Sequence, residues 1–132
     1  MIADSVAALY RLTKDQMAKI VCINGTADLS GFRYPLPSLA EIKGDAYLTA
    51  YDHELPALVA IGGNAELAGY DYPLPSLVSI GGSAFFRHYK HALPSLVSIG
   101  LHLQLHNYRH TLPSLANVGL MQQARCRICE KN

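Results

Sequence analysis

Apolar and polar residues along the chain follow a pattern that returns every 19 residues. The phrase LPSL begins at residues 36, 74, 93 and 112, and LPAL begins at 55, so successive starts differ by 19 without any insertion. A degenerate unit covers residues 17–35, and the last unit loses the pattern after Gly119. A fixed period of this kind is typical of a solenoid, in which each unit buries its apolar face by stacking on its neighbours.

Five positions of the unit, numbered 1–19 from the first Leu of LPSL, stay apolar along the chain: positions 1, 4, 7, 13 and 16. We expect these columns to form the core. Position 16 is always aromatic, with Phe32, Tyr51, Tyr70, Tyr89 and Tyr108. Such a column could stack the bases of a single-stranded nucleic acid. We favour a packed internal ladder, because buried aromatic rings contribute the largest apolar area per residue.

The segment LHLQLHN at residues 101–107 alternates between leucine and polar residues. A period of two indicates a β-strand, which predicts that Leu101, Leu103 and Leu105 point inward. By register, we expect one strand at positions 9–14 of each unit, and successive strands should form a parallel sheet. The predicted fold class is therefore mainly β, a parallel β-solenoid of about five to six 19-residue coils covering residues 17–119.

Two recurring residues predict the corners of each coil. Proline at position 2 lacks an N–H donor and has a restricted φ, so it suits a turn rather than a strand. Glycine at position 8, as in Gly62, Gly81 and Gly100, predicts a second corner with positive φ.

Both ends of a solenoid expose apolar surface and unpaired strand edges, which need cover. Residues 1–18 depart from the repeat and predict a helical N-terminal cap. Asp4 or Ser5 can cap a first helix, and Thr13 with Gln16 has the form of a capping box for a second. Residues 120–132 are then the C-terminal cap or tail.

The repeat pattern LPSL..IGG.A.L..Y resembles a short leucine-rich repeat, and more closely the phrasing of receptor L domains, which are right-handed parallel β-helices. The resemblance covers residues 17–119. It implies a compact, nearly straight solenoid that binds a ligand or a protein, and it carries over no catalytic residue. Compact repeats of this kind also look similar to bacterial and phage-type proteins.

Composition excludes several classes of protein. Half of the 132 residues are hydrophobic and 16% are charged, too apolar for a disordered chain. The net charge of +1 gives no general attraction for nucleic acid or an anionic membrane. We find neither a spanning apolar run nor a signal-peptide pattern, and three cysteines are too few for a disulfide scaffold. We therefore expect one domain over residues 1–132, located in the reducing cytoplasm.

The charges are distributed unevenly along the chain. Residues 41–71 contain six acidic residues and one lysine, whereas residues 72–132 contain six lysines or arginines and one acidic residue. Five of the six histidines also fall in the second half. This asymmetry is compatible with drift on a solvated surface, with a partner of mixed charge, or with head-to-tail self-association.

Residues with catalytic or metal-binding chemistry do not combine into a recognisable site. The serines at position 3 form one column and predict hydrogen bonds between turns rather than a nucleophile. His91 and His110 share position 18 on neighbouring coils, but a metal usually needs three or four ligands. Cys126 and Cys129 form a single CxxC motif, which is a weak signal without further ligands. We expect no enzymatic activity, no cofactor and no metal.

The hypothesis that remains is an interaction module, such as a small inhibitor or adaptor, that binds a protein partner through the outward face of its sheet. The outward strand positions that we assign to this site are Tyr47, Glu66, Phe85, Arg87, His102, Gln104 and His106. An alternative site is the ridge at positions 17 and 18, with Asp52, His53, Asp71, Tyr72, Lys90, His91, Arg109 and His110. The second hypothesis is a nucleic-acid-associated protein, or an inhibitor of a nucleic-acid-handling complex, that uses the His/Arg-rich C-terminal half. We expect a monomer or a weak homodimer.

Overall fold

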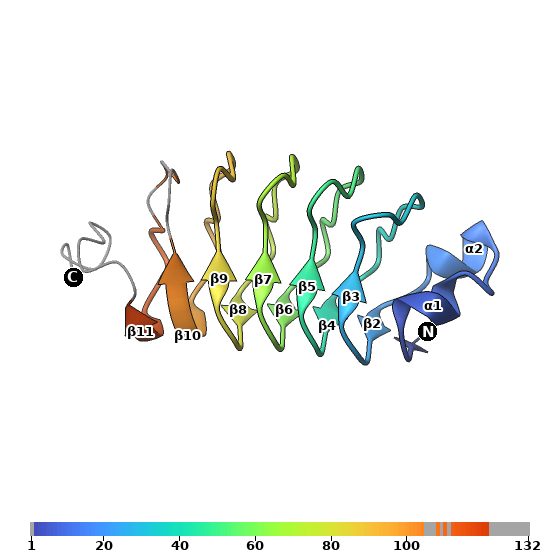
Figure 1. The fold of residues 1–132 in the computed structure, drawn as a ribbon, viewed down its shortest axis with the longest axis horizontal. Coiled ribbons are helices and arrows are strands. Elements are labelled where there is room, and N and C mark those ends of the chain that lie inside the picture. The colour runs from blue at the N-terminus through green and yellow to red at the C-terminus, as the bar shows by residue number, and fades with distance from the viewer. Residues whose placement is uncertain (1, 105–107, 109, 111, 122–132) are drawn as a thin grey trace.

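The computed structural model describes residues 2–104, 108, 110 and 112–121, with the backbone alone for 119–121. The repeats form a mainly β, parallel solenoid of about six turns, with two short helices at its N-terminal end (Figure 1), which confirms the predicted fold class. In chain order the elements are β1 (Ile2–Ala3), α1 (Val6–Leu9), α2 (Lys14–Met17), β2 (Cys22–Ile23), β3 (Ala27–Asp28), β4 (Glu41–Ile42), β5 (Ala46–Tyr47), β6 (Ala60–Ile61), β7 (Ala65–Glu66), β8 (Ser79–Ile80), β9 (Ala84–Phe85), β10 (Ser98–Gln104) and β11 (Asn117–Met121).

Coils 1–4 each contain two short strands, so the predicted strand at positions 9–14 is confirmed for the second strand, and the prediction of a single strand per coil is wrong. The first strand occupies positions 6–7 and the second occupies positions 11–12. Strands β2, β4, β6 and β8 pair in parallel as one sheet face, and β3, β5, β7 and β9 pair as another. In the fifth coil β10 runs through both faces, pairing with β8 and then with β9.

A polar ladder at position 10 stabilises the corner between the two faces. The N–H of Asn64 donates to the Asp45 carboxylate (2.7 Å), and the N–H of Ser83 donates to the Asn64 side-chain oxygen (2.8 Å). Each side chain thereby satisfies a backbone donor of the next coil that the sheet leaves unpaired at the bend. Where Leu101 replaces glycine at position 9, β10 continues through this corner, and Leu101 itself is 47% exposed rather than inward as predicted.

Glycine occupies position 8 because the coils approach closely there, and not because φ is positive. Gly69 is the glycine with positive φ among the described residues, so the predicted conformation of Gly62, Gly81 and Gly100 is wrong. A Cβ atom on Gly81 would collide with the carbonyl oxygen of Gly62, and one on Gly62 would collide with that of Lys43. The constraint therefore comes from the neighbouring coil.

We expect Gly81→Ala to lower the free energy of unfolding by about 1–3 kcal/mol, as for an overpacked interior, because the obstructing atoms are backbone atoms of a stacked coil. Gly31→Ala is the matched control, since a Cβ there meets nothing within 4 Å. Urea unfolding of both variants measures the difference. Equal stability of the two variants would contradict the close approach of the coils.

The five predicted core columns are confirmed, and a sixth joins them. Leucines and isoleucines of positions 1, 4, 7 and 13 are buried in one continuous cluster. Position 11 adds small buried residues, namely Ala27, Ala46, Ala65 and Ala84. The tyrosines of position 16 form the predicted internal ladder: the rings of Tyr51 and Tyr70 stack with centroids 6.4 Å apart, as do those of Tyr70 and Tyr89. Each ladder hydroxyl donates to a backbone carbonyl of the preceding coil, for Tyr70 that of His53 at 2.9 Å.

The N-terminal cap contains the predicted helices and an additional strand. Ser5 caps α1 by accepting from the N–H of Ala8, and Thr13 and Gln16 form the predicted capping box of α2. Strand β1 pairs in parallel with β2 and thereby covers the first edge of that sheet face. Of the C-terminal segment 120–132, residues 122–132 lie outside the described part of the chain.

Candidate interaction surface

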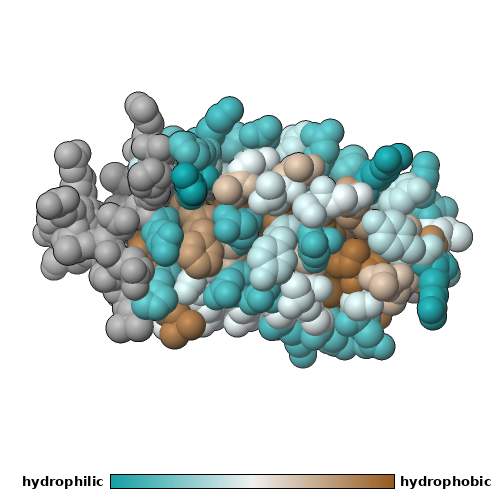
Figure 2. Space-filling view, viewed as in Figure 1, coloured by the Kyte–Doolittle hydropathy of each residue, from teal (hydrophilic) through white to brown (hydrophobic). Residues whose placement is uncertain are grey.

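The sheet face formed by β3, β5, β7, β9 and the end of β10 presents one side chain per coil at position 12. The strand register places Asp28, Tyr47, Glu66, Phe85 and Gln104 in one row, each beside the next. Figure 2 shows this side of the molecule as a mixture of hydrophilic and hydrophobic patches. The face therefore has the varied composition that the sequence predicted for it.

The N-terminal part of this face is acidic and surrounds Tyr47. Tyr47 is 38% exposed, and its hydroxyl donates to the Asp45 carboxylate at 3.2 Å. The negative charge of Asp45, followed by that hydrogen bond, raises the pKa of Tyr47. The Ser30 hydroxyl and N–H donate to Asp28 and lower the pKa of that carboxyl, which therefore stays ionised at neutral pH. Tyr47 thus presents an aromatic ring within a negatively charged field.

The C-terminal part of the face is apolar and basic. Phe85 lies outward as predicted, but it is half-buried rather than freely exposed. Arg87 at position 14 of the same coil is exposed, and His102 and Gln104 of the next coil are half-buried. The register therefore brings four of the seven predicted residues into one row, namely Tyr47, Glu66, Phe85 and Gln104. Arg87 follows two residues after Phe85, His102 lies at the position-10 corner, and His106 lies outside the described residues.

In the alternative ridge at positions 17 and 18, the histidines of position 18 each form a hydrogen bond to the preceding coil. Nε2 of His91 lies 2.6 Å from the carbonyl oxygen of Asp71, and Nε2 of His110 lies 2.6 Å from that of Lys90. A carbonyl only accepts, so each Nε2 carries a proton and donates to the preceding coil. His53 makes the equivalent contact with Arg33. These histidines have a structural role that their column in the sequence did not reveal.

The exposed polar and charged side chains of the ridge remain available to a partner. Asp52, Asp71, Lys90 and His110 are exposed, and the Tyr72 hydroxyl donates to Asp52 at 2.8 Å. That bond is the main cause that raises the pKa of Tyr72. Arg109 lies outside the described residues. Among those that are described, no three or more His, Cys, Asp or Glu side chains gather where they could hold a metal ion.

The serine column has the predicted structural role. The hydroxyls of Ser76, Ser95 and Ser114 donate to the carbonyl oxygens of Pro56, Pro75 and Pro94, respectively, at 2.6–2.9 Å. They therefore connect successive turns. Cys22 is buried with a free thiol, and Cys126 and Cys129 lie outside the described residues.

Comparison with known proteins adds no identification. No protein-family model, curated protein or solved structure matches this chain. Within the described residues, no helix has both the length and the apolar character required to cross a membrane. Functional inference therefore depends on the surfaces of the solenoid.

Two surface features were missed by reasoning from the sequence. The first is the ladder at position 10, to which Asp45 belongs. The residue type at this position varies, but from Thr26 to Ser83 each side chain accepts a hydrogen bond from a backbone N–H of the next coil. The second is a column of exposed valines at position 5. The sequence contains a signal for this column: valine recurs at position 5, between the inward positions 4 and 7, although position 5 need not be buried.

Proposed function

We propose that this protein is a non-enzymatic interaction module that binds a protein partner through the face formed by β3, β5, β7, β9 and β10. Tyr47 and Phe85 are the apolar anchors of the proposed site. Glu66, Arg87, His102 and Gln104 supply its polar contacts. An adaptor or small inhibitor that acts in the cytoplasm fits this description.

The observation that carries the proposal is the order of side chains along the position-12 row. Two aromatic residues on alternate coils flank Glu66, with carboxylates toward the N-terminus and Arg87 beside the second aromatic. Aromatic and arginine side chains are enriched among the residues that dominate binding energy at protein interfaces. Opposite charges at the two ends of one face would orient a partner of mixed charge. The resemblance of the repeat to ligand-binding receptor L domains favours the same role.

We expect Tyr47→Ala and Phe85→Ala each to weaken partner binding by more than about 1 kcal/mol, because truncation removes a central apolar contact. The protein is immobilised, the retained partner is identified by mass spectrometry, and its affinity is then measured by calorimetry. Tyr10→Ala is the matched control, since Tyr10 is 58% exposed but lies at the end of α1. Unchanged affinity of a Tyr47→Ala/Phe85→Ala double variant would move the site to the ridge of Asp52, Asp71 and Lys90.

A second candidate function is association with nucleic acid, or inhibition of a complex that handles it, through the C-terminal half. The exposed Arg87, Lys90 and His110 lie on the fourth and fifth coils and favour this alternative. Phosphate contacts release counterions, so such binding weakens steeply with salt, whereas an aromatic-centred protein contact does not. Measurement of partner affinity at several salt concentrations separates the two functions.

A further inference from the structure

The sheet face formed by β2, β4, β6, β8, the start of β10 and β11 is a second surface with no assigned role. Its edge carries the valine column of position 5. Val21, Val59, Val78 and Val97 are four of the eight large hydrophobic residues that are exposed in the described part of the chain. Exposed apolar residues that gather in one row, rather than singly, indicate a contact surface.

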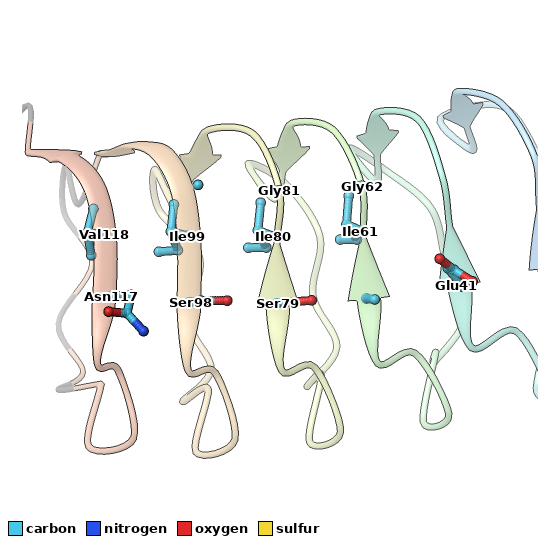
Figure 3. A pocket seen from close by; sticks show the side chains of 12 residues that line it. Glu41, Ile61, Gly62, Ser79, Ile80, Gly81, Ser98, Ile99, Asn117 and Val118 are labelled. Atoms are coloured by element: carbon cyan, nitrogen blue, oxygen red, sulfur yellow. The ribbon is translucent and has the colours of Figure 1, made fainter.

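A shallow groove of about 600 Å³ runs beside this row. Its lining includes Gly62, Gly81 and Gly100 of position 8 and the small side chains of position 6. Figure 3 shows Ser79 and Ser98 projecting in a row from successive strands, with the glycines alongside. Because glycine has no side chain, the face consists of a raised valine row and a parallel furrow.

The face is also free of charge over most of its length. Positions 1–9 of the third to sixth units, which begin at Leu55, Leu74, Leu93 and Leu112, contain no Asp, Glu, Lys, Arg or His. The second coil adds two charged residues here: Glu41 at position 6, which lines the groove, and the exposed Lys43 at position 8. A partner that fits must therefore be apolar and regular at the spacing of the coils.

We propose that the occupant of this face is a second copy of the chain, placed side by side with the first about a two-fold axis parallel to the solenoid axis. The axis passes between positions 6 and 7 of the two facing strands. It reverses the order of positions across the interface, so position 5 of one copy lies over position 8 of the other. Val59, Val78 and Val97 of one copy then lie over Gly62, Gly81 and Gly100 of the other, whereas Val21 lies over Asn24 in the first coil. The contact is the same from both sides, as two-fold symmetry requires. The result is a dry, interdigitated contact between two sheets.

Size and charge in the second coil favour this arrangement. In that coil the exposed Lys43 stands at position 8, where the third to fifth coils have glycine, and Ala40 stands at position 5, where those coils have valine. Lys43 of one copy therefore lies opposite Ala40 of the other, so a large side chain meets a small one. The same symmetry brings Glu41 of each copy beside Lys43 of the other, so the charges of the face pair across the interface. An antiparallel arrangement would instead place valine row on valine row.

The contact area limits the strength of this dimer. Five coils spaced by about 4.8 Å and four positions spaced by about 3.3 Å define a patch on the order of 300 Å² per copy. A standard stable interface covers about 800 Å² per partner, so we infer a weak dimer that forms with rising concentration. The interaction goes beyond the proposed function, because it uses a different sheet face and leaves the face of Tyr47 and Phe85 accessible.

The first test measures self-association by sedimentation over a wide concentration range. We expect a concentration-dependent dimer in the unmodified chain and at least about a tenfold weaker association for Val78→Asp, because the dimer would bury unpaired carboxylates. Val78 is exposed, so the variant should fold, and circular dichroism checks this. Arg87→Glu on the other sheet face is the control and should associate normally. A chain that stays monomeric throughout, or a Val78→Asp variant that still dimerises, would overturn the proposal.

Charge variants of the second coil test the geometry. Glu41→Lys alone and Lys43→Glu alone each place like charges together twice per dimer, so both should associate more weakly than the unmodified chain. An equimolar mixture of the two variants should recover the dimer, because the lysine introduced in one copy then lies beside the glutamate introduced in the other, while the unmodified Glu41 and Lys43 still pair. No recovery in the mixture would refute the two-fold arrangement. Binding of a partner through Tyr47 and Phe85 should persist in Val78→Asp, so the two proposals fail separately.

Discussion

Leu77→Ala should lower the free energy of unfolding by about 2–5 kcal/mol, the range measured for buried leucines that leave a cavity. Leu77 occupies position 4 in the middle of the solenoid and is 0% exposed, with coils stacked on both sides. The surrounding side chains cannot collapse into the space without displacing their own partners in the next coil. Denaturant unfolding monitored by circular dichroism measures the change.

Leu101→Ala is the matched control for this experiment, because it deletes the same atoms from a leucine that is 47% exposed. We expect it to change the free energy of unfolding by less than about 0.5 kcal/mol, as for surface substitutions. A large effect at Leu101 would mean that position 9 points inward, as the alternating pattern of residues 101–107 predicted. A small effect at Leu77 would mean that the core columns are solvated.

The protein should lose stability steeply above about pH 10, the pKa of tyrosine in an unfolded chain. Burial raises the pKa of Tyr51, Tyr70, Tyr89 and Tyr108 above that value. Below pH 10 the tyrosines are neutral in both states, so their contribution is fully present. As the pH rises further, the unfolded chain ionises first, and each ladder tyrosine then costs up to about 1.4 kcal/mol per pH unit until its folded pKa is reached.

Unfolding free energies between pH 8 and pH 11 test this expectation. Tyr70→Phe removes one ladder hydroxyl and should make the decline shallower, although loss of its bond to His53 costs about 1 kcal/mol at neutral pH. Tyr10→Phe, at an exposed ring outside the ladder, is the matched control. If the free energies of unfolding of Tyr70→Phe and of the unmodified chain fall in parallel as the pH rises, the ladder tyrosines do not remain protonated in the folded state.

Several features could be predicted because they depend on contacts that the repeat itself specifies. Residues 19 apart occupy the same place in successive coils, so a position that stays apolar in most units must face the shared interior. This argument places Leu58 and Ile61 in the core and makes a ladder of the position-16 tyrosines. Local hydrogen-bonding chemistry likewise predicts the capping box of Thr13 and Gln16, because both partners lie within one helical turn.

The candidate site could be predicted in part. Alternation along a strand places Tyr47, Glu66 and Phe85 outward, and their adjacency follows from the period. The extent to which Phe85 is buried could not be predicted, because it depends on side chains of neighbouring coils that cover part of the ring. The histidines of position 18 lie at the surface as expected, but the bonds that His91 and His110 donate to carbonyl oxygens 20 residues earlier could not be predicted, because they form only between stacked coils.

By itself, the sequence determined the period, the parallel solenoid, the inward columns and the helical cap, since each follows from residue spacing or from contacts within one turn. The tertiary structure alone decided what holds the corner between the two sheet faces and why glycine occupies position 8. Those features depend on how closely a coil approaches the one before it: Gly81 is required by the carbonyl oxygen of Gly62, and the corner is held by Asn64 bonding to Ser83. The raised valine row beside its furrow is likewise a product of stacking, because a row exists only once separate coils lie side by side.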